Sequence, residues 1–152
     1  MVTSTQTTTQ TLYDQDYYLW IKTTINQLRT GQFSAVDLEN LLEELETMGR
    51  SQKRAIKSLL TKLLEHLLKL KYWDNERERN QGNWKREIRA FRTQIKDELT
   101  DSPSLKPYIL EIFDKCYQEA RKLASDISQL PLDTFPIIPI GSLEQILDEN
   151  WF

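Results

Sequence analysis

The side chains that could do acid–base or metal chemistry stand in the first half of this 152-residue chain. Glu39, Glu43 and Glu46 follow one another at spacings of four and three, so a helix would carry the three carboxylates on one face. The only histidine, His66, lies on the next predicted helix. Because carboxylates and an imidazole can ligate a metal or exchange protons, Glu43, Glu46 and His66 are the candidates for a metal-assisted enzyme.

Other features of the sequence argue against that enzyme. No second histidine exists, and Leu63 occupies the position where a di-iron bundle has the glutamate of its Glu-x-x-His motif. The four glycines form neither a phosphate loop nor a nucleophile elbow. His66 falls at the edge of an apolar helical sector, where an imidazole packs its ring and reaches a polar partner. We expect a histidine of that kind, no cofactor and no catalytic residue.

Positive charge is concentrated in the middle of the chain. Residues 1–48 carry 2 basic and 7 acidic side chains, residues 49–96 carry 14 and 5, and residues 97–152 carry 4 and 11. The net charges are therefore −5, +9 and −7. Basic side chains recur on one flank of a predicted helix: Lys85, Arg89, Arg92 and Lys96.

This basic segment, residues 69–96, has two interpretations. With Tyr72, Trp73 and Trp84 interleaved, it could supply phosphate contacts and stacking platforms for a nucleic acid. Alternatively, the acidic outer helices neutralise it and its lysines and arginines only face solvent. The overall charge of −3 and the pI near 5.3 favour the second interpretation, because a general nucleic-acid binder keeps an uncompensated basic surface.

The elements that must position these residues are predicted to be helices. Ile56, Leu60, Leu63, Leu67 and Leu70 recur at helical spacing in a Leu-rich central helix, residues 51–72, whose apolar sector is wide enough to need cover on more than one side. An amphipathic helix over residues 13–29 precedes it. A second helix begins at a capping box, Ser34 to Asp37, and is predicted to end at Gly49.

After the central helix, residues 74–83 read as a polar turn. Further helices are predicted over residues 84–99 and 104–129, the second ended by Pro131. Residues 135–139 must be extended, since a residue before proline leaves the α region, and Ser142 with Gln145 can cap a last short helix. The prediction is an all-α, single-domain bundle of about five helices, onto which the C-terminal segment packs back.

Composition predicts a cytoplasmic protein without a membrane span. The single cysteine, Cys116, allows no internal disulfide and sits in an apolar stripe, so we expect a buried thiol in a reducing compartment. No stretch reaches the roughly 18 apolar residues that a membrane span needs. Residues 1–11 are rich in Thr and Gln and lack signal-peptide features, so they are predicted to be a disordered tail before a domain of residues 12–152.

Several short motifs, in order along residues 12–152, resemble one protein family. They are Tyr13-x-x-Asp16-Tyr17-x-x-Trp20, Leu41-Leu42-Glu43-Glu44-Leu45-Glu46-x-Met48-Gly49, His66-Leu67-Leu68-Lys69, Trp84-x-x-Glu87-Ile88-x-x-x-Arg92, Ser102-Pro103-Ser104-Leu105, Phe135-Pro136 and Ile146-Leu147-Asp148. The family is the bacterial, mainly cyanobacterial, one catalogued as domain of unknown function 29. The resemblance implies an all-helical protein with no established activity, so it transfers no catalytic residues.

Three hypotheses follow. The first is a non-enzymatic interaction or regulatory module in which Tyr18, Leu19, Tyr72 or Trp73 contacts a partner protein or a second copy. The second is a nucleic-acid-binding accessory protein that uses the basic segment, and the third is the metal-assisted enzyme. Polar residues shared by the family motifs are expected to meet as a hydrogen-bonded cluster, structural or functional: Glu43, Glu46, His66, Trp84 and Arg92.

Overall fold

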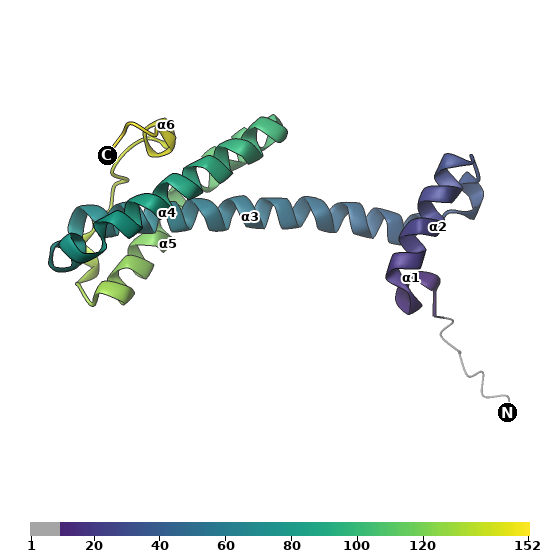
Figure 1. Ribbon diagram of the computed structural model, residues 1–152, viewed down its shortest axis with the longest axis horizontal. Helices are drawn as coiled ribbons and strands as arrows, with labels where there is room; N and C mark the ends of the chain where they lie inside the picture. The colour runs from purple at the N-terminus through teal and green to yellow at the C-terminus, as the bar shows by residue number, and fades with distance from the viewer. Residues whose placement is uncertain (1–9) are drawn as a thin grey trace, which may run out of the picture. The chain divides into compact units, whose positions relative to one another are not determined.

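The computed structural model describes residues 10–152, and the predicted all-α fold is confirmed, with no strand in that range (Figure 1). The predicted disordered tail falls largely on residues 1–9, which lie outside the described range. The chain divides into two compact units, Met1–Gly49 (unit 1) and Arg50–Phe152 (unit 2). No helix among the described residues is both long and apolar enough to cross a membrane.

Unit 1 begins with two helices in place of the predicted one. Helix α1 spans Leu12–Gln15 and α2 spans Tyr17–Arg29. Asp16 separates them because its backbone leaves the helical region, while its carboxylate accepts a hydrogen bond of 3.0 Å from the Leu19 amide and so caps α2. Gly31 follows α2 with a φ of +76°, a conformation that glycine adopts without strain.

Helix α3 spans Leu38–Tyr72 and corrects two predictions. Ser34 lies in a short 3-10 turn, η1 (Phe33–Ala35), and Asp37 is the residue that accepts from the backbone and side-chain nitrogens of Asn40 where α3 starts. Gly49 does not end a helix, because α3 continues through it. Strong helix formers on both sides of Gly49 outweigh the roughly 1 kcal/mol that a helical glycine costs.

The predicted turn over residues 74–83 is also helical. Helix α4 spans Asp74–Asp101, so the turn after α3 shrinks to Trp73. Arg77 holds this turn, since its Nε donates to the Leu70 carbonyl at 2.6 Å and its Nη2 to the Lys71 carbonyl at 2.6 Å. These carbonyls at the end of α3 would otherwise lack partners.

Unit 2 contains the hydrophobic core. A 3-10 turn, η2 (Pro103–Leu105), leads from α4 into α5 (Lys106–Ser128), which is followed by η3 (Leu132–Thr134) and α6 (Leu143–Leu147). The expected end before Pro131 and the capping box of Ser142 and Gln145 are confirmed. The core joins side chains of α3, α4, α5, α6 and the segment between α5 and α6, among them Ile56, Leu60, Leu63, Leu67, Trp84, Ile95, Ile109, Cys116, Phe135 and Ile146.

The C-terminal segment is attached to α4 and α5 by side chains that donate to its carbonyls. The Tyr117 hydroxyl donates to Pro136 O at 2.6 Å, and the buried Arg121 donates to Phe135 O through two nitrogens at 3.1 and 2.9 Å. Side-chain donors are needed here because an irregular segment cannot pair its own backbone groups. The prediction that this segment packs back onto the bundle is confirmed.

Candidate functional sites

His66 is a boundary histidine, as predicted, with both ring nitrogens occupied. Nδ1 lies 2.8 Å from the Lys62 carbonyl one turn earlier on α3, and Nε2 pairs with the Glu87 carboxylate of α4. Its ring packs edge-on against Phe91. Both partners are acceptors, whereas a neutral imidazole has only one N–H group to donate. Both contacts can be hydrogen bonds at the same time only if one further proton is added to the pair of a neutral imidazole and an ionised carboxylate. The pair therefore links α3 to α4.

Lys69 and Trp84 form a second contact between the same helices. The Lys69 ammonium lies 5.6 Å from the centre of the Trp84 ring, which in turn stacks on Trp73 at 5.6 Å. Lys69 is buried, and this burial lowers its pKa, while the charges of Glu65 and Glu87 act in the opposite direction. A cation over an indole face is stabilised by the ring quadrupole. Trp84 is thus a buried anchor between the two helices.

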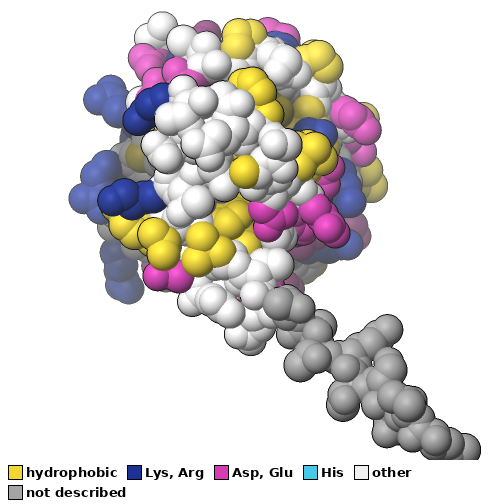
Figure 2. Space-filling view, turned by 90° about the vertical axis from the view of Figure 1, so that its right-hand side faces the viewer, with side chains coloured by type: hydrophobic (Ala, Val, Ile, Leu, Met, Phe, Trp, Pro, Cys, Tyr) yellow, Lys and Arg dark blue, Asp and Glu magenta, His cyan; other side chains and the backbone are white. Residues whose placement is uncertain are grey.

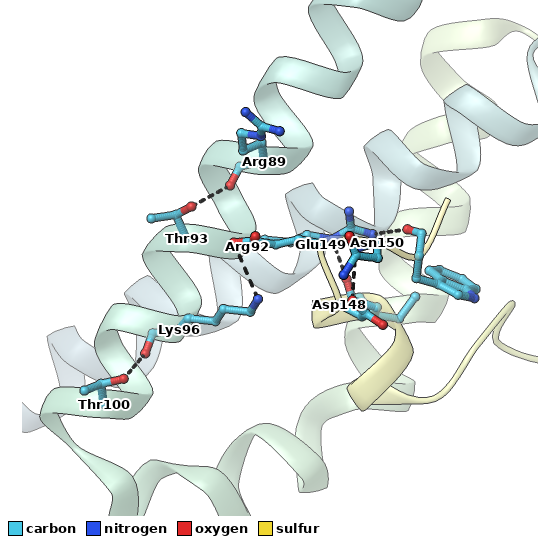
Figure 3. A network of polar contacts seen from close by, with 10 residues as sticks. Arg89, Arg92, Thr93, Lys96, Thr100, Asp148, Glu149 and Asn150 are labelled. Atoms are coloured by element: carbon cyan, nitrogen blue, oxygen red, sulfur yellow. Dashed lines mark hydrogen bonds and ion pairs between the residues drawn. The ribbon is translucent and has the colours of Figure 1, made fainter.

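Arg92 binds the end of the chain rather than another polar side chain. From α4 it donates through Nε to Ile146 O at 2.8 Å and through Nη2 to Trp151 O at 2.9 Å (Figure 3). It is 3% exposed, and burial lowers its pKa, partly offset by the charges of Asp148 and Glu149. Two neutral carbonyls therefore hold a buried positive charge.

Three members of the five-residue cluster proposed from sequence have partners outside it. His66, Trp84 and Arg92 lie in unit 2 with different partners, whereas Glu43 and Glu46 belong to unit 1. Glu87 and Lys69 were missed as site residues. Both stand in the motifs that carry the family resemblance, but only the register between α3 and α4 brings them to His66 and Trp84.

The four predicted nucleic-acid contacts differ in accessibility. Lys85 and Arg89 are exposed on α4, while Arg92 is buried and bound to carbonyls. Lys96 pairs with Glu149 at 3.7 Å (Figure 3). Lys85, Arg89 and Arg92 nevertheless line one hollow of about 280 Å³ together with Phe152. Two of the four side chains thus keep exposed charge.

Unit 1 has an aromatic and carboxylate contact of its own. Tyr13 and Tyr17 both donate their hydroxyls to Glu44, the second at 2.7 Å. The hydrogen bond to Glu44 raises the pKa of Tyr13 to about 12 and raises that of Tyr17, and the same bonds lower the pKa of Glu44. The rings of Tyr13 and Tyr17 pack on Trp20. Three aromatic residues and one carboxylate thereby hold α1 and α2 to the start of α3.

Between α2 and the start of α3 lies an apolar groove of about 230 Å³, called here the unit 1 groove. Trp20 lies in its lining, 5% exposed, and its indole N–H has no acceptor in the described part of the chain. Figure 2 shows a face of the protein on which hydrophobic side chains reach the surface among acidic ones. The exposed apolar walls of the unit 1 groove include Tyr17, Ile25, Leu28, Leu45 and Met48.

Two further expectations concern the thiol and a metal. Cys116 is fully buried, as predicted, and burial raises the pKa of its thiol, which makes the reactive thiolate less accessible. Within residues 10–152, no three or more His, Cys, Asp and Glu side chains gather in a group that could hold a metal ion. The metal-assisted hypothesis therefore gains no geometric support.

Two of the exposed contacts predicted from sequence are wrong. Tyr72 and Trp73 are half-buried and pack against the unit 2 core, with Tyr72 edge-on to Phe135. Tyr18 and Leu19 of α2 are exposed, as predicted. The surface available to a partner therefore includes unit 1, whereas Tyr72 and Trp73 are largely committed to the core.

Comparison with protein families gives a match to the domain of unknown function DUF29 over residues 12–152. The chain belongs to this family. The match covers every motif on which the resemblance rests, from Tyr13 to Asp148. The search of curated proteins gave no match, and neither did the search of solved structures. The DUF29 family has no assigned activity, so function must be argued from the surfaces described above.

Proposed function

We propose that this DUF29 protein is a non-enzymatic interaction module that binds a basic amphipathic helix of a partner protein in the unit 1 groove. The observation that carries the proposal is the contrast between what unit 1 exposes and what it buries. Of its described residues only Trp20 and Thr24 are buried. Ten large apolar or aromatic side chains are exposed: Tyr17, Tyr18, Leu19, Ile25, Leu28, Phe33, Leu38, Leu42, Leu45 and Met48.

Such a unit is physically incomplete. A segment of about 40 residues cannot bury enough surface by itself and commonly relies on association. Scattered apolar residues need no explanation, but exposed apolar side chains that gather along one groove mark an interaction site. The groove walls are already fixed, because the bonds from Tyr13 of α1 and Tyr17 of α2 to Glu44 hold both helices against α3. A fixed groove between two helices suits a third helix with apolar side chains at i, i+3, i+4 and i+7.

Charge selects the kind of helix. Residues 1–48 carry 2 basic and 7 acidic side chains, a net charge of −5. A second copy of unit 1 would bring the same negative charge to the interface, whereas a helix flanked by Lys and Arg would complement it. A backbone or side-chain acceptor on such a helix could also satisfy the Trp20 N–H, which lacks a partner.

The test uses two fluorescent 18-residue helical peptides with leucines at i, i+3, i+4 and i+7. One carries lysine and the other glutamate at the remaining positions. Fluorescence anisotropy should show that the intact protein binds the lysine peptide at least about tenfold more tightly, a difference of about 1.4 kcal/mol. Equal binding of both peptides, or of neither, would contradict the proposal.

A matched pair of variants locates the binding. Leu45→Asp places a charge in the groove, and Leu110→Asp does the same on α5 of unit 2; the two side chains are 55% and 50% exposed. Leu45→Asp should weaken the lysine peptide at least about tenfold, while Leu110→Asp should leave binding unchanged. Light scattering gives the mass in parallel. If the wild type is a dimer that Leu45→Asp dissociates, the groove binds a second copy of the chain and not a partner helix.

A further inference from the structure

A line of basic and polar side chains runs along α4, independently of unit 1. Arg77, Gln81, Lys85, Arg89 and Arg92 are spaced by four, four, four and three residues, so they follow one flank of the helix. Two neighbouring hollows of about 340 and 280 Å³ lie along this flank, and both are lined by Lys85 and Phe152. Cationic side chains thus border two hollows, and the Phe152 ring lines both of them.

Arg92 gives the second hollow a fixed positive charge. Its Nε and Nη2 are held by the carbonyls of Ile146 and Trp151, so the guanidinium has a set position and a charge that these neutral acceptors do not cancel. Glu149, the one acidic side chain in the lining, pairs with Lys96 at 3.7 Å. A buried arginine without a direct carboxylate partner favours the arrival of an anion.

Lys85 and Arg89 supply the charges that can close on a ligand. Both are exposed, and Arg89 lies one turn before Arg92 on α4 (Figure 3). Arg77 is committed elsewhere, because it pairs with Asp74 and donates to the carbonyls at the end of α3. The second hollow therefore combines one fixed guanidinium with two long cationic side chains that can turn toward it.

We propose that the hollow lined by Lys85, Arg89 and Arg92 binds the phosphate of a nucleotide, with the Phe152 ring as a stacking surface for the base. Arginine forks match phosphate oxygens, lysine adds a point charge, and aromatic rings stack on bases of any sequence. The nucleotide can be free or part of a single strand, since the chemistry recognised is the same. This proposal does not depend on the unit 1 groove.

Three probes test it with the intact protein: pyrophosphate, ADP and a ten-residue oligo-dT strand. The Lys85→Glu/Arg89→Glu variant should weaken each probe that the wild type binds by at least about tenfold. The control, Lys115→Glu/Lys122→Glu, makes the same charge change at exposed positions of α5. It should leave binding unchanged. Phe152→Ala should weaken ADP and oligo-dT but not pyrophosphate. Circular dichroism verifies that the variants fold.

The three probes distinguish a free nucleotide from a nucleic-acid strand. Binding of ADP or pyrophosphate that only the α4 variant loses supports a site for the free nucleotide. Binding of oligo-dT alone, again lost only in the α4 variant and falling with salt, supports the same site with a nucleic-acid strand as the phosphate source. No binding of any probe, or equal loss in the α5 control, overturns the proposal.

Discussion

At the scale of residues, arginine side chains donate hydrogen bonds to backbone carbonyls that regular secondary structure would pair elsewhere in the chain. Arg92 and Arg121 are both buried, and both donate to carbonyls of the irregular C-terminal segment. Arginine suits this role because it carries five donors in a rigid fork and keeps its charge when buried. The cost of burying each guanidinium is offset by the carbonyls that it satisfies.

Replacing Arg92 should therefore release the end of the chain. Arg92→Met keeps much of the side chain's length but removes the donors to Ile146 O and Trp151 O, so unfolding should become easier by roughly 2–4 kcal/mol. Urea unfolding followed by circular dichroism measures this change. Arg89→Met, at an exposed position of the same helix, is the control and should stay within about 0.5 kcal/mol. Equal losses would remove the anchoring role from Arg92.

The tyrosine pair of unit 1 makes a prediction about high pH. Because the Tyr13 pKa is raised from its usual 10 to about 12, the stabilising bond to Glu44 is fully present below pH 10 and is lost as the pH rises toward 12. Tyrosinate absorbance at 295 nm should show this late ionisation, and Glu44→Gln should move it toward 10. Glu39→Gln, at an exposed position, should not. Burial also raises the pKa of Tyr117 to about 12, so part of the late absorbance should remain in every variant. A late amplitude that Glu44→Gln leaves unchanged would contradict the assignment to Tyr13.

Sequence reasoning reached some of these residues and missed their partners. The position of His66 at the edge of an apolar sector was enough to predict a packed ring with a polar contact. It could not identify Glu87, which stands 21 residues later and meets His66 only once α3 and α4 are in register. Glu43 and Glu46 were grouped with His66 because the predicted break at Gly49 placed them on an adjoining helix.

At the scale of elements, the predicted helices were right where the apolar spacing is strong and wrong where it is weak. The stripes of α3 and α5 and the capping box of Ser142 and Gln145 were recognised. Residues 74–83 have almost no apolar side chains, so periodicity gave no helical signal, although their Glu and Arg content favours a helix. Gly49 was predicted to end a helix and Gly82 fell in the predicted turn, yet both lie inside helices.

A glycine substitution tests the corrected start of α4. A Cβ at Gly82 would meet no atom within 4 Å, so Gly82→Ala should stabilise the helix by roughly 0.5–1 kcal/mol in urea unfolding. If residues 74–83 formed a loop, the same change would have little effect. Gly31→Ala is the opposite control, because a φ of +76° strains alanine and should destabilise unit 1.

At the scale of the whole molecule, stability is unevenly distributed. All residues of the hydrophobic core cluster belong to unit 2, from Ile56 to Leu147, while the described residues of unit 1 bury only Trp20 and Thr24. The sequence predicted one domain over residues 12–152, and the family match covers the same span. Within it, composition could not indicate that the apolar stripes of residues 17–48 would stay at the surface.

This distribution predicts that unit 2 folds without unit 1. A fragment of residues 50–152 should be helical and unfold cooperatively in urea, at a midpoint close to that of the main transition of the intact chain. Far-ultraviolet circular dichroism and intrinsic tryptophan fluorescence should give coincident curves. A fragment that is largely unfolded would show that the unit 2 core is not sufficient.

Hydrogen–deuterium exchange shows directly whether the unit 1 groove receives a basic amphipathic helix. The intact protein is compared with and without the lysine peptide at saturating concentration. We expect the peptide to slow the exchange of backbone amides in residues 17–28 and 41–48, to have no such effect on Leu45→Asp, and to leave unit 2 unchanged. Unaltered exchange in these segments, or protection confined to residues 50–152, would contradict it.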